Sequence, residues 1–187
     1  MPKTETFDKE LVIKQVTEVF HEKSYSLTSM QDLVDATGLN RSSIYNTFGS
    51  KLDLYMLCLK DYQKISMNYI NEILSSSNCY INTIERIFNL NSHCENGCLI
   101  NSCVTEMANQ ENTINSFLKK HDDGMINLFK DIVEKGQEQG SINTNKSAYE
   151  YAIYLVSSLK GFNLSTVLMD NSKDKQSIIN TILSVLN

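Results

Sequence analysis

The sequence predicts an all-α fold, in which a small N-terminal unit of three helices is joined by a long helix to a larger helical unit, with about nine helices in all. Only one proline, Pro2, and seven glycines occur in 187 residues, so little in the chain interrupts a helix. Apolar residues recur three and four positions apart along most of the chain. Serine, threonine and asparagine precede several of these stretches, as helix caps do.

The first predicted helix covers residues 8–23, where apolar side chains form one stripe that would be buried. The members of this stripe are Val12, Ile13, Val16, Val19 and Phe20. A polar stretch then breaks the pattern. Either Thr28 with Gln31 or Ser29 with Asp32 can form a reciprocal capping box, so a second helix is expected to begin there.

A pair of short helices is predicted next, joined by a tight turn. Gly38 ends the second helix after about two turns, because glycine readily adopts the left-handed conformation. Asn40 can cap a third helix, whose inward-facing residues are Ile44 and Phe48. Two helices separated by about four residues that include a glycine have the spacing of a helix-turn-helix.

A long helix and a larger helical region are expected to make up the rest of the chain. Ser50 and Asp53 can form another capping box, which opens a helix that extends to about Leu74. We therefore expect two domains, residues 1–52 and residues 53–187. Apolar periodicity predicts further helices near residues 80–90, 99–108, 113–139, 147–169 and 173–186.

The net charge of −5 limits how this protein could bind a polyanion such as DNA. Lysine and arginine supply much of the affinity for phosphates, and the chain as a whole is acidic. Between Asp35 and Asp53, however, the only charged residues are Arg41 and Lys51, so this window carries a charge of +2. Any contact with DNA would therefore depend on a focused basic patch.

The third predicted helix carries side chains that suit a DNA major groove. Arg41 can donate a bidentate pair of hydrogen bonds to guanine, and Asn46 can pair with adenine. Ser42 and Ser43 can contact either base edges or phosphates. Side chains better suited to the phosphate backbone are those of Tyr45, Thr47 and Lys51. The alternative is an ordinary helical hairpin whose polar side chains are only solvated.

From Gly38 to Lys51, the chain resembles the DNA-binding signature of the TetR family of regulators. The positions that match this signature are Gly38, Tyr45, Phe48 and Lys51. With the helices on either side, the resemblance covers roughly the first third of the chain. Weaker likenesses at residues 97–106 and 139–143 extend it loosely over most of the remainder.

The resemblance implies a homodimer that binds a double-stranded DNA operator and a small-molecule effector. In the family, the tyrosine and lysine that match Tyr45 and Lys51 contact phosphates. Residues at the start of the second helix, here Ser29 and Gln31, approach the same strand. The last two helices of family members build a four-helix dimer interface. The helix predicted at 147–169 is apolar on more than one face, which suits such a dimer.

The effector site is expected among apolar, aromatic and methionine side chains of the larger domain, because these suit irregular apolar ligands. The candidates are Phe88, Cys103, Met107, Phe117, Met125, Phe129, Tyr151, Tyr154 and Phe162. For most of them, the alternative is an ordinary place in the hydrophobic core.

The five cysteines, an odd number in a chain without a secretory signal, indicate reduced thiols in a cytoplasmic protein. No run of about 18 apolar residues predicts a membrane span. Cys94, Cys98 and Cys103 lie in one short region and could instead form a redox or metal sensor. Because a five-residue spacing puts Cys98 and Cys103 on different faces of a helix, structural thiols are favoured, and no metal or cofactor is expected.

The sequence thus favours a DNA-binding transcriptional regulator, specifically a homodimeric repressor that a small-molecule effector releases from its operator. An enzyme is not expected, because the sequence contains no nucleophile elbow, phosphate loop or strong metal signature, and its three histidines are scattered. The acidic net charge keeps one alternative open, a helical adaptor that binds protein instead of DNA.

Overall fold

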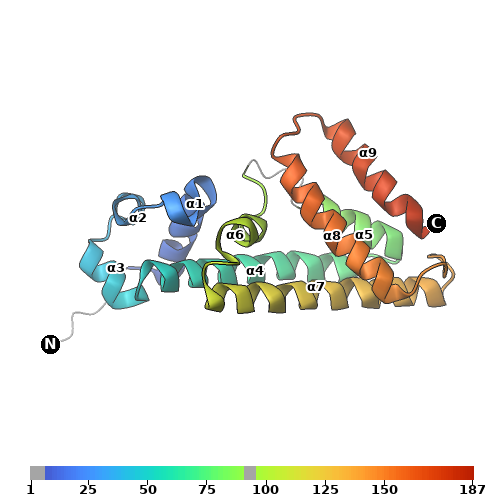
Figure 1. Ribbon diagram of the computed structural model, residues 1–187, viewed down its shortest axis with the longest axis horizontal. Coiled ribbons are helices and arrows are strands. Elements are labelled where there is room, and N and C mark those ends of the chain that lie inside the picture. The colour runs from blue at the N-terminus through green and yellow to red at the C-terminus, as the bar shows by residue number, and fades with distance from the viewer. Residues whose placement is uncertain (1–6, 91–95) are drawn as a thin grey trace. The chain divides into compact units, whose positions relative to one another are not determined.

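The computed structural model describes residues 7–90 and 96–187, and these residues form helices joined by turns and short loops (Figure 1). Nine α-helices and one short 3-10 helix occur within the described ranges. Their bounds are α1 Lys9–Leu27, α2 Met30–Thr37, α3 Arg41–Phe48, α4 Lys51–Ser76, α5 Tyr80–Asn89, α6 Leu99–Met107, α7 Asn112–Glu138, α8 Ala148–Thr166, α9 Ser172–Leu183 and η1 Ser184–Leu186. The all-α fold expected from the sequence is confirmed.

The chain divides into two compact units, which meet inside α4 between Ser66 and Met67. We call residues 1–66 the N-terminal unit and residues 67–187 the C-terminal unit. The functional division expected between residues 52 and 53 lies at the start of the same helix and stays a prediction.

The N-terminal unit is held together by one apolar core. Phe20 of α1 meets Tyr55 of α4 with ring centroids 4.8 Å apart, and Tyr25 lies 4.9 Å from the same ring. The other large side chains buried in this unit are Val12, Val16, Leu33, Ile44, Phe48, Leu54 and Leu59. Helices α2 and α3 have only eight residues each, too few to be stable alone in water, so this packing stabilises them.

Helix α1 contains a backbone break where the sequence predicts the first helix to end. Ser24 has φ 62° and ψ 168°, a conformation that glycine adopts and other residues rarely do. The helical pattern resumes for a short stretch and ends at Leu27.

The start of α2 is fixed by one of the two capping boxes that the sequence allows. Ser29 Oγ accepts a hydrogen bond from the Asp32 amide at 3.2 Å, and the Asp32 carboxylate accepts one from the Ser29 amide at 2.7 Å. The alternative box of Thr28 with Gln31 is not the one formed, because Ser29 is the N-cap of α2, and the Thr28 hydroxyl donates to the Ser24 carbonyl at 2.6 Å. The local sequence therefore determines where the second helix begins.

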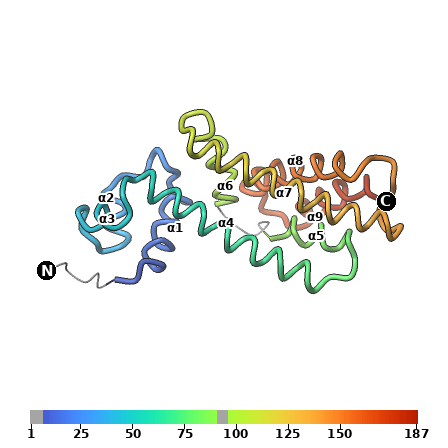
Figure 2. Tube along the Cα trace, turned by 90° about the horizontal axis from the view of Figure 1, so that it is seen from below, coloured from blue at the N-terminus to red at the C-terminus, as the bar shows by residue number. Residues whose placement is uncertain are grey.

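In the C-terminal unit, α7 packs against α5, α6 and α8, and α9 packs against α5 and α8 (Figures 1 and 2). One hydrophobic core joins the end of α4 with α5, α7, α8, α9 and η1. Its fully buried members include Ile84, Phe88, Phe129, Val133, Ala152, Leu155, Ile179 and Leu186.

The turn between α7 and α8 is tied to the end of the chain through Asn143. Its side-chain amide donates to the carbonyls of Val185 and Asn187, both at 2.9 Å. Its side-chain oxygen accepts from the Tyr151 hydroxyl at 2.6 Å and from the Asn145 amide at 2.9 Å. One asparagine thus joins the turn, α8 and η1.

Candidate nucleic-acid interface

Helices α2 and α3 form the helix-turn-helix that the sequence predicts. Gly38 closes α2 in the left-handed conformation, at φ 68°, and its amide donates to the Val34 carbonyl at 2.8 Å. Asn40 Oδ1 accepts from the Ser43 amide at 2.9 Å and so caps α3. Ile44 and Phe48 are buried against the rest of the unit. These anchors fix which side of α3 faces outward.

The outward side of α3 carries the residues predicted to read DNA. Arg41, Ser42, Tyr45 and Asn46 are exposed, whereas Ser43 and Thr47 are half-buried. Tyr45 keeps 48% of its surface exposed although its ring is large. A short helix with an apolar inner side and a polar outer side of this kind fits the width of a major groove.

Arg41 is linked to α2 through Gln31. The Arg41 guanidinium donates to Gln31 Oε1 at 3.4 Å, and Gln31 Nε2 donates to Asp35 Oδ1 at 2.8 Å. The Arg41 guanidinium thus has a partner on α2, which is itself bonded to Asp35. On α3 itself, Asn46 Nδ2 donates to Ser42 Oγ at 3.3 Å. The hydrogen bond between Gln31 and Asp35 was not predicted from the sequence. It could have been inferred, because Asp35 follows Gln31 by four residues on one helix.

Two of the residues predicted to contact phosphates already have intramolecular partners. Lys51 Nζ donates to the carbonyls of Tyr25 at 2.8 Å and Thr28 at 2.7 Å, and it lies 4.2 Å from the centre of the Tyr25 ring. The Ser29 hydroxyl donates to Asp32 at 2.7 Å within the capping box. Lys51 therefore fastens the start of α4 to the end of α1, and its phosphate contact, like that of Ser29, stays a prediction.

Asp32 places a negative charge beside this surface. Its carboxylate accepts a hydrogen bond from Lys23 Nζ at 2.6 Å and further bonds from Ser29. The Lys23 ammonium, followed by the Ser29 donors, holds the pKa of Asp32 well below its usual range. The carboxylate therefore stays ionised at neutral pH, and it neutralises one of the few cations near the helix-turn-helix.

The residues predicted for the effector site belong mostly to the packed interior. Five of them are members of the C-terminal core, namely Phe88, Met125, Phe129, Tyr151 and Phe162. Cys103 and Met107 are buried on α6, Phe117 is half-buried, and Tyr154 is exposed. A cavity in this unit is lined by other residues, among them Tyr80 and Lys135. The role of the predicted residues in effector binding stays a prediction.

Of the three thiols predicted as an alternative sensor, two lie within the described ranges. Cys98 is half-buried, Cys103 is fully buried, and Cys94 lies outside the described residues. Among residues 7–90 and 96–187, no group of three or more histidine, cysteine, aspartate or glutamate side chains could hold a metal ion. In the N-terminal unit, burial raises the pKa of the Cys58 thiol to about 12, which keeps it protonated.

Helix α8 carries an apolar stripe on its outward side. Tyr149, Ile153 and Leu164 of α8, with Val167 directly after its last residue, are each exposed by 41% or more, and their helical spacing places them within one narrow sector. The opposite side of α8 contributes Tyr151, Leu155, Phe162 and other residues to the core. We call these four outward residues the α8 stripe.

Comparison with known proteins identifies the family. The family described as "Bacterial regulatory proteins, tetR family" matches residues 12–56, and the "Tetracyclin repressor-like, C-terminal domain" family matches residues 80–182. The second match alone covers more than half of the chain. The chain belongs to the TetR family. It is a DNA-binding transcriptional regulator, as the sequence predicted.

Among TetR-family relatives, the HTH-type transcriptional regulator YezE of Bacillus subtilis is 26% identical over 149 residues, which span 76% of this chain and 77% of YezE. The HTH-type transcriptional repressor DhaR of Mycobacterium sp. is 22% identical over 180 residues, which span 94% of this chain and 90% of DhaR. A cysteine mutant of the regulator CifR, solved in complex with a 26-bp operator duplex, superposes with a TM-score of 0.86. CifR is 18% identical, and the superposition covers 99% of this chain and 100% of CifR.

None of the helices in the described part of this TetR-family chain has both the length and the apolar character needed to span a bilayer.

Proposed function

We propose that this TetR-family regulator is a homodimeric repressor that leaves its operator when a small-molecule effector binds the C-terminal unit. The main support is the outward side of α3, where an arginine, an asparagine and two serines stand on a helix anchored by Ile44 and Phe48. Two named relatives agree with this role: DhaR is a repressor, and CifR was solved on operator DNA.

Base recognition is assigned to the first turns of α3. Arg41 donates to guanine, Asn46 pairs with adenine, and the serines Ser42 and Ser43 contact neighbouring base edges or phosphates. The support is exposure for Arg41, Ser42 and Asn46, together with the Gln31 contact that orients the guanidinium. The side chains assigned to the phosphate backbone are those of Ser29, Gln31, Tyr45, Thr47 and Lys51.

Dimerisation is assigned to the α8 stripe. Large apolar side chains in a row on one exposed sector of a helix favour burial against a partner. A second copy of the same helix offers the same stripe, which satisfies the self-complementarity of a two-fold interface. Two copies also bring two basic patches to one operator, which compensates for the small charge of each.

Effector control requires that the ligand distinguish two arrangements of the dimer. A ligand lowers operator affinity only to the extent that it binds the DNA-incompetent arrangement more tightly. We assign this ligand to the C-terminal unit, leaving the N-terminal unit to contact DNA.

The DNA assignment is tested by a matched pair of arginine variants, because the chain contains only Arg41 and Arg86. Selection of bound sequences from a random DNA pool, followed by gel-shift titration, gives the preferred operator of the wild type. Arg41→Ala should relax the base preference at one position in each half-site, at a cost of about 1–3 kcal/mol. Arg86→Ala removes the same charge from α5 and should leave the preference unchanged. If both variants select the wild-type sequence with wild-type affinity, base reading by Arg41 is wrong.

The dimer assignment is tested by sedimentation at micromolar concentration. Leu164→Asp places a charge in the α8 stripe and should shift the protein to monomer, with a parallel loss of operator affinity. Ser165→Asp introduces the same charge about a quarter-turn away on the same exposed helix and should leave the dimer intact. A monomeric wild type would contradict this part of the proposal.

A further inference from the structure

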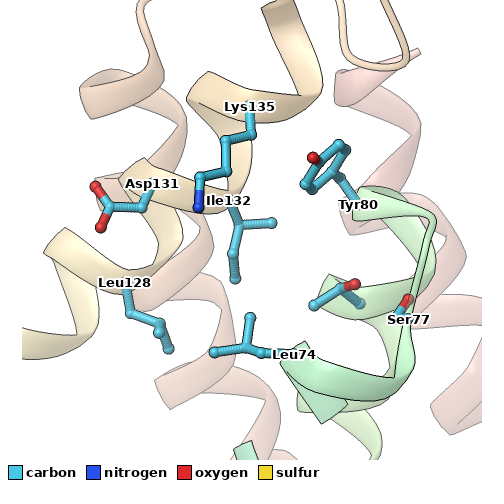
Figure 3. A pocket seen from close by; sticks show the side chains of 8 residues that line it. Leu74, Ser77, Tyr80, Leu128, Asp131, Ile132 and Lys135 are labelled. Carbon is cyan, nitrogen blue, oxygen red and sulfur yellow. The ribbon is translucent and has the colours of Figure 1, made fainter. Parts of the chain in front are cut away.

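A cavity of about 330 Å³ lies in the C-terminal unit where the end of α4, the start of α5 and the second half of α7 meet (Figure 3). This volume is at the lower end of the range for small-molecule sites. The residues that line it are Leu74, Ser77, Tyr80, Thr83, Leu128, Asp131, Ile132 and Lys135. None of the side chains predicted for the effector site is among them.

One wall of the cavity is apolar. Leu74 comes from α4, and Leu128 and Ile132 come from α7, where they are one helical turn apart (Figure 3). Ile132 is almost completely buried, so this wall is continuous with the core. A hydrocarbon group placed against it would leave water at a gain of about 25 cal/mol for each Å² covered.

Two hydrogen-bond donors stand at the mouth of the cavity. The hydroxyl oxygen of Tyr80 accepts a bond from Gln139 Nε2 at 3.1 Å, which leaves the tyrosine proton available to a ligand. Lys135 extends from α7 so that its ammonium lies over Ile132 (Figure 3). Within residues 7–90 and 96–187, Lys135 forms no ion pair, whereas Lys130 on the same helix pairs with Glu134 at 3.6 Å.

The remaining polar groups of the lining present acceptors. The hydroxyls of Ser77 and Thr83 both donate to the Cys79 carbonyl, at 3.1 Å and 2.9 Å. Ser77 Oγ also accepts from the Cys79 amide at 3.5 Å, so Thr83 is the better acceptor for a ligand. The Asp131 side chain projects toward the outer edge of the cavity, away from Tyr80 (Figure 3). The site thus offers the Lys135 ammonium and the Tyr80 hydroxyl as donors, an apolar wall, and hydroxyl acceptors beside α5, with the Asp131 carboxylate one helical turn from Lys135 on α7.

We propose that this cavity binds a small amphipathic carboxylate. Its carboxylate lies between the Lys135 ammonium and the Tyr80 hydroxyl, and its hydrocarbon body lies on the leucine and isoleucine wall. A hydroxyl or amide on the far end of the ligand donates to Thr83 or Ser77. This inference rests on the proposed function, because it gives the effector of the regulator a place and a chemical class.

The probe is 4-hydroxyphenylacetate, with its amide and tyramine as the neutral and cationic counterparts of the same size. Binding to the intact, DNA-free protein is measured by ligand-observed NMR and calorimetry. The carboxylate should bind at least fivefold more tightly than the amide, and tyramine should bind more weakly than either.

Three variants test whether the carboxylate binds at Lys135 and Tyr80. Lys135→Gln should weaken carboxylate binding by about five- to tenfold while leaving amide binding unchanged, because only the charged contact is lost. Tyr80→Phe should weaken carboxylate binding by about threefold. Lys120→Gln removes the same charge from an exposed position elsewhere on α7 and should change neither affinity. Circular dichroism of each variant checks that the helices are intact.

The inference is overturned if the carboxylate does not bind, if it binds no better than the amide, or if Lys135→Gln binds it with wild-type affinity. Operator binding by the ligand-free protein is measured in parallel and tests the proposed function separately. An intact operator complex without carboxylate binding removes only this inference. Carboxylate binding by a protein that selects no DNA sequence removes the proposed function and leaves the cavity assignment in place.

Discussion

The break in α1 allows the conformational energy stored at one residue to be measured. Ser24 has φ 62° and ψ 168°, where the Cβ atom of any L residue other than glycine is crowded by the backbone. Replacing Ser24 by glycine removes that atom and leaves the fold of the chain unchanged. We therefore expect Ser24→Gly to stabilise the N-terminal unit.

Two opposing terms set the size of this effect. Relief of a strained backbone conformation contributes about 1–3 kcal/mol. Glycine loses more backbone freedom on folding than serine does, which costs about 0.5–1 kcal/mol. The Ser24 hydroxyl donates only to the neighbouring Lys23 carbonyl at the surface, so its removal has little further effect. The free energy of unfolding should rise by about 1 kcal/mol as the difference of these terms.

Urea unfolding of the full-length protein, followed by amide signals of the N-terminal unit, measures the change. Ser24→Ala is the matched control, because it removes the hydroxyl and keeps the Cβ atom. Alanine should therefore give no stabilisation. If glycine and alanine have the same effect, or if glycine lowers the free energy of unfolding, the backbone at residue 24 is not strained and the reasoning is wrong.

Three further predictions concern hydrogen bonds within the two units. Lys51→Met should lower the free energy of unfolding of the N-terminal unit by about 2 kcal/mol even without DNA, because two carbonyls lose a charged donor. If the stability in urea is unchanged, Lys51 does not stabilise the fold and any role of this residue is limited to DNA binding. Hydrogen bonds from Ser147 lower the pKa of Glu150 in the folded protein. The ionised carboxylate therefore stabilises the fold at pH values above its unfolded pKa of about 4.3, and this stabilisation is lost as the pH falls through the folded pKa. The backbone amide of Ser147 contributes most to this shift and its hydroxyl contributes next, and Ser147→Ala removes only the hydroxyl. The variant should therefore raise the pKa of Glu150 part of the way toward its ordinary value in an NMR titration, and a curve identical to that of the wild type would show that the hydroxyl does not contribute. Asn143→Ala should destabilise the C-terminal unit by about 2 kcal/mol and speed amide exchange near residues 185–187. Asn145 is exposed and bonds Asn143 only through its backbone amide, so the control Asn145→Ala should change neither quantity.

Local chemistry explains why the helix boundaries could be predicted. The capping box of Ser29 and Asp32 uses residues three positions apart, and Gly38 closes α2 by its own backbone freedom. The helical spacing of Ile44 and Phe48 likewise determined which side of α3 is buried. Interactions of this kind depend on neighbours in the sequence, so a single sequence contains the information.

Tertiary contacts explain what could not be predicted. Lys51 meets the carbonyls of Tyr25 and Thr28, 26 and 23 residues earlier, and no local pattern indicates such a contact. The cavity beside Tyr80 and Lys135 depends on how three helices pack, whereas side-chain type alone selected the expected effector residues. Phe88, for example, is completely buried in the core, and its contact with an effector stays a prediction.

The partners of the basic residues near the helix-turn-helix bear on how the regulator searches DNA. Lys23 is paired with Asp32, Lys51 with backbone carbonyls, and Arg41 with Gln31, which in turn bonds Asp35. The Asp32 carboxylate cancels the charge of Lys23, whereas Arg41 and Lys51 keep their charges because their partners are neutral. Non-specific affinity for phosphates of an arbitrary sequence therefore rests on a small local charge. We therefore expect the regulator to dissociate quickly from sequences other than its operator. The regulator can thus be selective in a genome full of competing sites without binding its operator with extreme affinity.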